Sequence, residues 1–179
     1  VREGVAGALR DCTLLIDASV SRWSGQQEPK GADEARTKLR AGTTSVAAAL
    51  ADRSHERAGA WDASVYSTLL ADLNDAMVTA RRVDRVAQHE PGDALYTGVS
   101  DPFSASVEAC RLVADEVATV LESGQRVDRK ALLESADGLG SVPTAISEAL
   151  EKLREAHVTP NASAEELQRL FGLALLLGH

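Results

Sequence analysis

The chain has 179 residues, which is enough to bury a hydrophobic core within one domain. Its formal net charge of −8 argues against nucleic acid as a partner, because that binding needs a positive surface to neutralise phosphates. The aromatic residues are two Trp, two Tyr and two Phe, so the core must be built from Ala, Leu and Val, and abundant Ala favours helices.

Apolar residues recur at steps of three and four along several stretches, which is the spacing of one face of an α-helix. The first predicted helix spans residues 2–23, and the second spans residues 32–53. Residues 54–60 are polar and predict a loop or a frayed joint. The third predicted helix, residues 62–88, has the clearest apolar stripe, formed by Tyr66, Leu69, Leu70, Leu73, Met77, Ala80, Val83 and Ala87.

Proline and glycine predict a loop over residues 89–100. Ser100 then has the character of an N-cap, and Pro102 fits the first turn of a helix. The sequence therefore predicts that a fourth helix begins at this point and ends at Gly124.

A fifth helix is predicted to start near Asp128, and its pattern breaks at Gly138–Pro143. This break is either a kink in one helix or a loop between two helices, the second of which resumes near Thr144. Ser163 followed by Glu166 is a capping-box pattern, which predicts the start of the last helix.

No run of residues alternates in the manner of a strand. The sequence predicts an all-α fold, a helical bundle of five to seven helices in a single domain that covers residues 1–179. No stretch approaches the roughly 20 apolar residues that cross a bilayer. The chain opens without an initiator Met and stops just after the apolar run 170–177, so we expect a fragment of a larger chain.

No complete catalytic or metal-binding motif is present. Gly138-x-Gly140 lacks a third glycine and follows a helix, so it indicates a helix break and not a dinucleotide loop. None of the histidines has a Glu three residues before it, as a carboxylate-bridged di-iron bundle needs. They are His55, His89, His157 and His179. We therefore expect no enzyme activity, no cofactor and no metal.

Cys12 and Cys110 both fall on apolar stripes, which favours two buried thiols, with a disulfide between them as the alternative. Asp72 and Asp75 lie three residues apart on one helix. They could hold a cation between them, although plain solvation of a charged face is the commoner role.

One basic cluster stands at the end of the third predicted helix. It consists of Arg81, Arg82 and Arg85, with His89 just beyond. This cluster is a candidate contact for an anionic ligand or for a membrane surface, because arginine presents fixed forks of donors to carboxylate and phosphate. The alternative is that it complements the helix dipole and pairs with Asp84 and Glu90.

The Leu-rich stretch 67–82, with its trailing Arg pair, resembles a helix of bacterial aromatic acid exporters of the fusaric-acid-resistance (FUSC) superfamily. Residues 103–110 resemble the helix that follows in those proteins, and residues 167–177 resemble the final helix of their soluble domain. The resemblance covers most of the chain as a pattern of helices.

This resemblance implies the cytoplasmic helical domain of an efflux transporter for aromatic or other organic acids, with a role in assembly, gating or regulation. Such a domain would lie at the cytoplasmic face of the bacterial inner membrane, and its partners would be the membrane part of the same protein and further copies of the chain. The alternative is a free-standing ligand-binding or scaffold bundle, such as the effector domain of a regulator.

The last predicted helix is apolar on more than one side, so it needs burial on more than one side. The residues that wrap more than one stripe are Leu170, Phe171, Ala174, Leu175 and Leu177. Either the bundle core encloses this helix, or a second subunit or the membrane part covers its outer face. Leu173 and Leu176 are expected to lie off the main stripe.

Overall fold

The computed structural model of the chain describes residues 2–23, 26–51, 63–88, 93–124, 129–157 and 163–177. These ranges contain seven α-helices and no strand, which confirms the predicted all-α fold. The helices are α1 (Arg2–Trp23), α2 (Ala32–Ala51), α3 (Ala63–Val86), α4 (Asp93–Ser123), α5 (Arg129–Gly140), α6 (Val142–Glu155) and α7 (Ala164–Leu177). The loop predicted over residues 54–60 lies outside the described residues.

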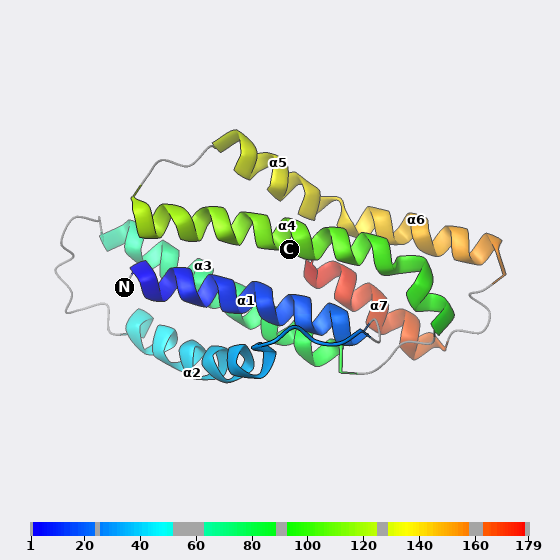
Figure 1. Ribbon diagram of the computed structural model, residues 1–179, viewed down its shortest axis with the longest axis horizontal. Coiled ribbons are helices and arrows are strands. Elements are labelled where there is room, and N and C mark those ends of the chain that lie inside the picture. The colour runs from blue at the N-terminus through cyan, green and yellow to red at the C-terminus, as the bar shows by residue number, and fades with distance from the viewer. Residues whose placement is uncertain are drawn as a thin grey trace.

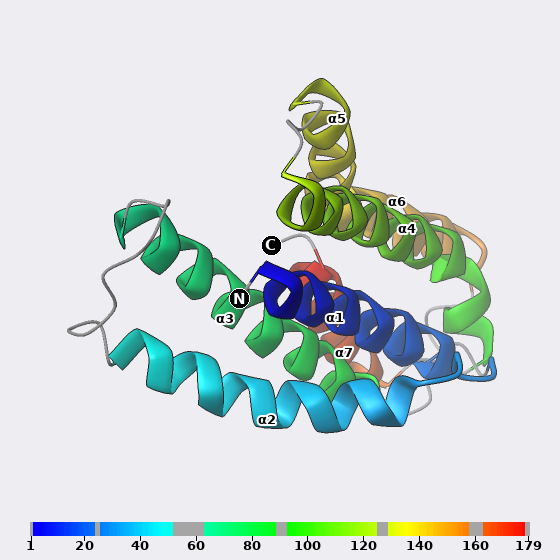
Figure 2. The same ribbon diagram turned by 60° about the vertical axis from the view of Figure 1, so that its left-hand side comes forward.

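Helix α1 lies at the centre of the bundle and packs against α2, α3 and α4 (Figure 1). The chain reverses direction from α1 to α2, from α2 to α3 and from α3 to α4. Helices α5 and α6 pack on α4, and α7 packs on α3 and α6. The first half of α5 stands away from the rest of the bundle (Figure 2).

The predicted stripes form the core. Along α3 the residues Leu70, Leu73, Met77, Ala80 and Val83 are buried, as is Ala87 in the turn that follows, as the periodicity predicts. Two of the few aromatic rings meet between α1 and α4, where Trp23 and Phe103 pack edge to face with ring centroids 5.0 Å apart. Such a contact adds stability beyond the buried area.

The loop predicted over residues 89–100 is wrong from Asp93 onward, because α4 begins there and carries Pro102 in its interior. Ser100 is therefore not an N-cap. Pro102 removes one backbone donor, and its ring crowds the carbonyl of Gly98, so the helix bends at its start (Figure 1). Burial outweighs this cost, since Val99 and Phe103 are completely buried on either side of the proline.

The break predicted at Gly138–Pro143 is a junction between two helices. The helix α5 continues through Gly138, and only Ser141 separates it from α6. The Ser141 hydroxyl donates a hydrogen bond of 2.7 Å to the Gly138 carbonyl. Pro143 lies in the first turn of α6, where a missing N–H costs nothing.

The capping box of α7 is confirmed. The Glu166 amide donates to the Ser163 hydroxyl at 3.2 Å, and the Ser163 amide donates to a Glu166 carboxylate oxygen at 2.6 Å. The prediction that Leu173 lies off the main stripe is wrong. Leu173 is completely buried, because α7 packs against both α3 and α6 and so has a wide buried face. The outward apolar side chains of α7 are Phe171 and Leu175.

Candidate functional site

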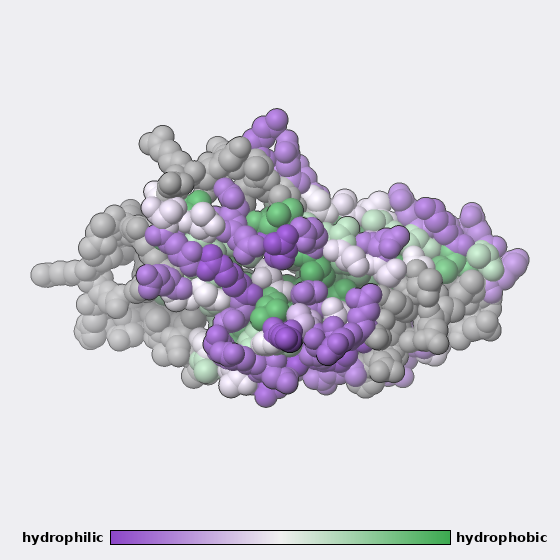
Figure 3. Space-filling model, viewed as in Figure 1, coloured by the Kyte–Doolittle hydropathy of each residue, from purple (hydrophilic) through white to green (hydrophobic). Residues whose placement is uncertain are grey.

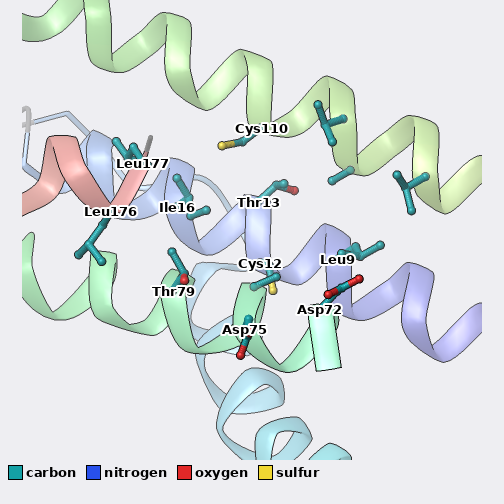
Figure 4. Close-up of a pocket in the computed structure, with 14 residues that line it drawn as sticks. Leu9, Cys12, Thr13, Ile16, Asp72, Asp75, Thr79, Cys110, Leu176 and Leu177 are labelled. Atoms are coloured by element: carbon teal, nitrogen blue, oxygen red, sulfur yellow. The ribbon is translucent and has the colours of Figure 1, made fainter. Parts of the chain in front are cut away.

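An apolar pocket of about 360 Å³ lies between α1, α3, α4 and the carboxyl end of α7 (Figure 4). Each of the three long helices contributes four residues, and α7 contributes two. The lining consists of Leu9, Cys12, Thr13, Ile16, Asp72, Asp75, Ala76, Thr79, Cys110, Val113, Ala114, Val117, Leu176 and Leu177.

Small side chains explain why a pocket forms at this place. Ala76 on α3 and Ala114 on α4 face the space between the helices and do not fill it. The two exposed aspartates in the lining show that the pocket is open to solvent, so it is a surface pocket and not a void in the core. Apolar side chains gather over α1 and α4 in the middle of the face shown in Figure 3, with hydrophilic side chains around them.

Asp72 and Asp75 are the charged residues among the described lining of this pocket. Both are exposed, and they lie one turn apart on α3, with Thr79 on the next turn. Figure 4 shows them on the α3 wall, across the pocket from Cys110 of α4. The predicted aspartate pair therefore lies at the mouth of an apolar pocket, where carboxylates would attract a positively charged group.

Cys12 and Cys110 line the same pocket as free thiols, so the disulfide alternative is wrong. Burial raises the pKa of Cys12 to about 12, with a further contribution from the nearby charge of Asp11. Burial also raises the pKa of Cys110 to about 11. Both thiols are therefore protonated at neutral pH, which makes them poor nucleophiles.

A second, polar pocket of about 70 Å³ lies at the other end of α3. Four arginines line it, Arg36 and Arg40 from α2 and Arg81 and Arg85 from α3. The remaining lining residues are Leu15, Asp84 and Gln88. Two members of the predicted basic cluster thus share a pocket with two arginines that the sequence pattern did not connect with them. The third member, Arg82, is exposed and outside this lining, and His89 lies outside the described residues.

Asp84 is a buried carboxylate, 8% exposed, that joins three helices beside this pocket. One of its oxygens accepts hydrogen bonds from Arg22 of α1 and Arg36 of α2, both at 3.1 Å, and from the Ser19 hydroxyl at 3.3 Å. Glu28 bonds to the same two arginines, to Arg36 at 2.6 Å. Sequence reasoning placed Asp84 only as a neighbour of the α3 arginines and missed these partners.

The described residues contain no group of three or more His, Cys, Asp or Glu side chains close enough together to hold a metal ion. His157 lies in the turn just after α6, in a left-handed conformation with φ of 57°, and the other three histidines lie outside the described ranges. Within the same ranges, no helix is both long and apolar enough to cross a bilayer.

The fold and these sites define an all-α bundle with an apolar pocket and a separate arginine-lined pocket. Comparisons with protein families, with curated proteins and with solved structures found no match to the chain. The resemblance to the aromatic acid exporters therefore stays a prediction.

Proposed function

We propose that this chain is a helical binding module that takes an apolar amine in the pocket between α1, α3, α4 and α7. The observation that carries the proposal is the composition of the lining, in which Asp72 and Asp75 are the charged groups of an otherwise mainly apolar wall. The volume of about 360 Å³ falls in the range of small-molecule sites.

The lining also favours one kind of cation. The described lining residues include no aromatic ring, so a quaternary ammonium group would lack the cation–π contacts that usually hold it. A protonated primary amine instead donates hydrogen bonds to carboxylates and to threonine hydroxyls, and Asp72, Asp75 and Thr79 offer both kinds of acceptor. An alkyl chain on the amine would occupy the apolar wall, at about 0.8 kcal/mol for each buried methylene group.

Three ligands with alkyl chains of the same length and different head groups separate the contribution of charge from that of apolar contact. Isothermal titration calorimetry is run on the full chain with octylamine, octanol and octanoate at the same pH and ionic strength. We expect affinity to fall in that order, because the aspartates attract the amine, are indifferent to the alcohol and repel the carboxylate. Tighter binding of octanoate than of octanol would refute the proposal.

A double variant, Asp72→Asn with Asp75→Asn, tests the site itself. Exposed ion pairs contribute at most about 1 kcal/mol, so we expect about a fivefold loss of octylamine affinity and little change for octanol. Asp101→Asn is the matched control, because Asp101 is an exposed aspartate of α4 outside the lining. Ala76→Leu adds bulk to the half-buried wall and should weaken all three ligands together.

The cytoplasmic domain of an aromatic acid exporter remains a second proposal, and the arginines of α2 and α3 are the observation that favours it. An exporter of aromatic acids has an anionic ligand. The pocket between α1, α3, α4 and α7 is poorly suited to an anion, because Asp72 and Asp75 would repel it. Saturable binding of benzoate or octanoate that depends on Arg85, together with failure of octylamine to bind, would favour the exporter domain over the amine-binding module.

A further inference from the structure

The lining of the apolar pocket repeats one spacing on three helices. On each of α1, α3 and α4 the lining residues occupy positions i, i+3, i+4 and i+7. These positions form one face of a helix over two turns, a length of about 10 Å. The three sets are Leu9, Cys12, Thr13 and Ile16 on α1, Asp72, Asp75, Ala76 and Thr79 on α3, and Cys110, Val113, Ala114 and Val117 on α4. The pocket is therefore an elongated groove between three helix faces, and its length is that of two helical turns.

The groove lies beyond the carboxyl end of α7. Figure 4 shows Leu176 and Leu177 at one end of it, beside Ile16, and Leu9 and Asp72 at the other end. The helices α1, α3 and α4 extend past the end of α7 (Figure 1). A further helix in the groove would therefore follow α7 and pack against three helix faces that already have the matching spacing.

The groove also specifies a charge. Asp72 and Asp75 are exposed at its mouth, and within the described part of the chain neither takes part in a hydrogen bond or an ion pair. The formal charge of −8 on the whole chain has the same sign as these two carboxylates. Both the local and the overall charge favour a basic partner.

We infer that the groove binds an amphipathic helix of a partner protein, with apolar side chains against the wall and a lysine at Asp72 and Asp75. The inference rests on the proposed function, because the lysine side chain is the primary amine that the aspartates recognise. Helices that bind in apolar grooves are anchored by residues at i, i+3, i+4 and i+7, and such a set has the length of this groove. The apolar stem of a lysine covers apolar surface while its ammonium group stays at the solvent-exposed mouth.

The probe is a synthetic peptide of about 15 residues, which is long enough to form a helix, with leucines along one face and lysines beside them. Its binding to the full chain is measured by fluorescence anisotropy. A second peptide has glutamate in place of every lysine, and a third keeps the leucines and lysines but has proline at a central position. We expect saturable binding of the lysine peptide, weaker binding of the glutamate peptide, and binding of the proline peptide that is at least about tenfold weaker, because proline breaks the helix.

Variants of the chain test the acidic mouth. Asp72→Asn with Asp75→Asn should weaken the lysine peptide about fivefold and should not weaken the glutamate peptide. Asp101→Asn is the matched control, because Asp101 is an exposed aspartate of α4 outside the lining, and it should change the affinity by less than about twofold.

Octylamine is titrated in parallel, so that failure of this inference is distinguished from failure of the proposed function. Binding of octylamine without saturable binding of the lysine peptide overturns the helical partner and leaves the amine-binding module in place. Binding of the peptide without octylamine supports the helical partner and refutes the small-molecule site. Equal binding of the proline or the glutamate peptide overturns the inference. Light scattering of the chain alone tests a second copy as the occupant, since a dimer that is lost in the double Asn variant would overturn a separate partner.

Discussion

Replacing the buried Asp84 by Asn should destabilise the bundle more than removing the charge of an exposed carboxylate such as Asp33. The side chain of Asp84 is 11% exposed, and those of its partners Arg22 and Arg36 are 25% and 15% exposed. Asn keeps an acceptor oxygen for Ser19 and for the arginines but removes the negative charge. The change therefore isolates the charge from the shape of the side chain.

The size of the effect follows from the two arginine contacts. Hydrogen bonds to charged groups are worth about 1.5–3 kcal/mol each, and roughly half of that is lost when the acceptor becomes neutral. Glu28 remains bonded to both arginines and limits their loss. We therefore expect Asp84→Asn to lower the free energy of unfolding by about 2 kcal/mol. Breaking a buried pair outright would cost about 3–5 kcal/mol.

Urea denaturation followed by circular dichroism measures this change, with Asp33→Asn as the control. Asp33 bonds to the same Arg36, but its side chain is 98% exposed, so its loss should cost less than about 0.5 kcal/mol. Equal costs for the two variants would show that burial does not strengthen the Asp84 contacts and would refute the reasoning.

Three further predictions concern packing and pH, and urea or thermal unfolding checks each of them. A Cβ at Gly98 would lie 2.5 Å from both methyl carbons of Leu153, so Gly98→Ala should destabilise by about 1–3 kcal/mol even though Ala is the better helix former. Leu173→Ala removes a completely buried side chain and should cost about 2–5 kcal/mol, whereas Leu175→Ala, at a side chain that is 56% exposed, should cost less than about 0.5 kcal/mol. Burial raises the pKa of Cys12 from its ordinary 9.0 to about 12, so the stability contributed by the protonated thiol is complete below pH 9 and falls as the pH rises toward 12. In Cys12→Ala the free energy of unfolding should therefore fall less steeply above pH 9. An equally steep fall in this variant would contradict the prediction.

The helices could be predicted because their signal is local. Buried positions recur every three or four residues along α3, so Leu73, Met77 and Ala80 identify its inner face without any knowledge of its partners. The capping box at Ser163 and Glu166 is equally local, since both groups belong to one turn.

The sequence predictions for Pro102 and Leu173 were wrong because contacts between residues distant in sequence outweigh the local helix preferences. Pro102 is a helix breaker by itself, yet the burial of Val99 and Phe103 carries α4 through it. Leu173 is buried because α7 packs on both α3 and α6, an arrangement that no pattern within α7 specifies.

The partners of Asp84 could not be predicted either, because they lie far from it along the chain. Ser19, Arg22 and Arg36 lie 65, 62 and 48 residues away from it along the chain. Charge patterning finds pairs three or four residues apart on one helix, so a network that connects three helices leaves no signal in the sequence.

The helix α3 lines two pockets of unlike charge. Asp75 and Arg81 are six residues apart, so about 9 Å along the helix axis separates its acidic section from its basic section. The sequence displays this division, but it does not reveal which helices face each section. In the fold, the acidic section meets apolar walls from α1, α4 and α7, and the basic section meets further arginines from α2. Packing thus places the acidic section of one helix beside an apolar pocket and its basic section among arginines of a second helix.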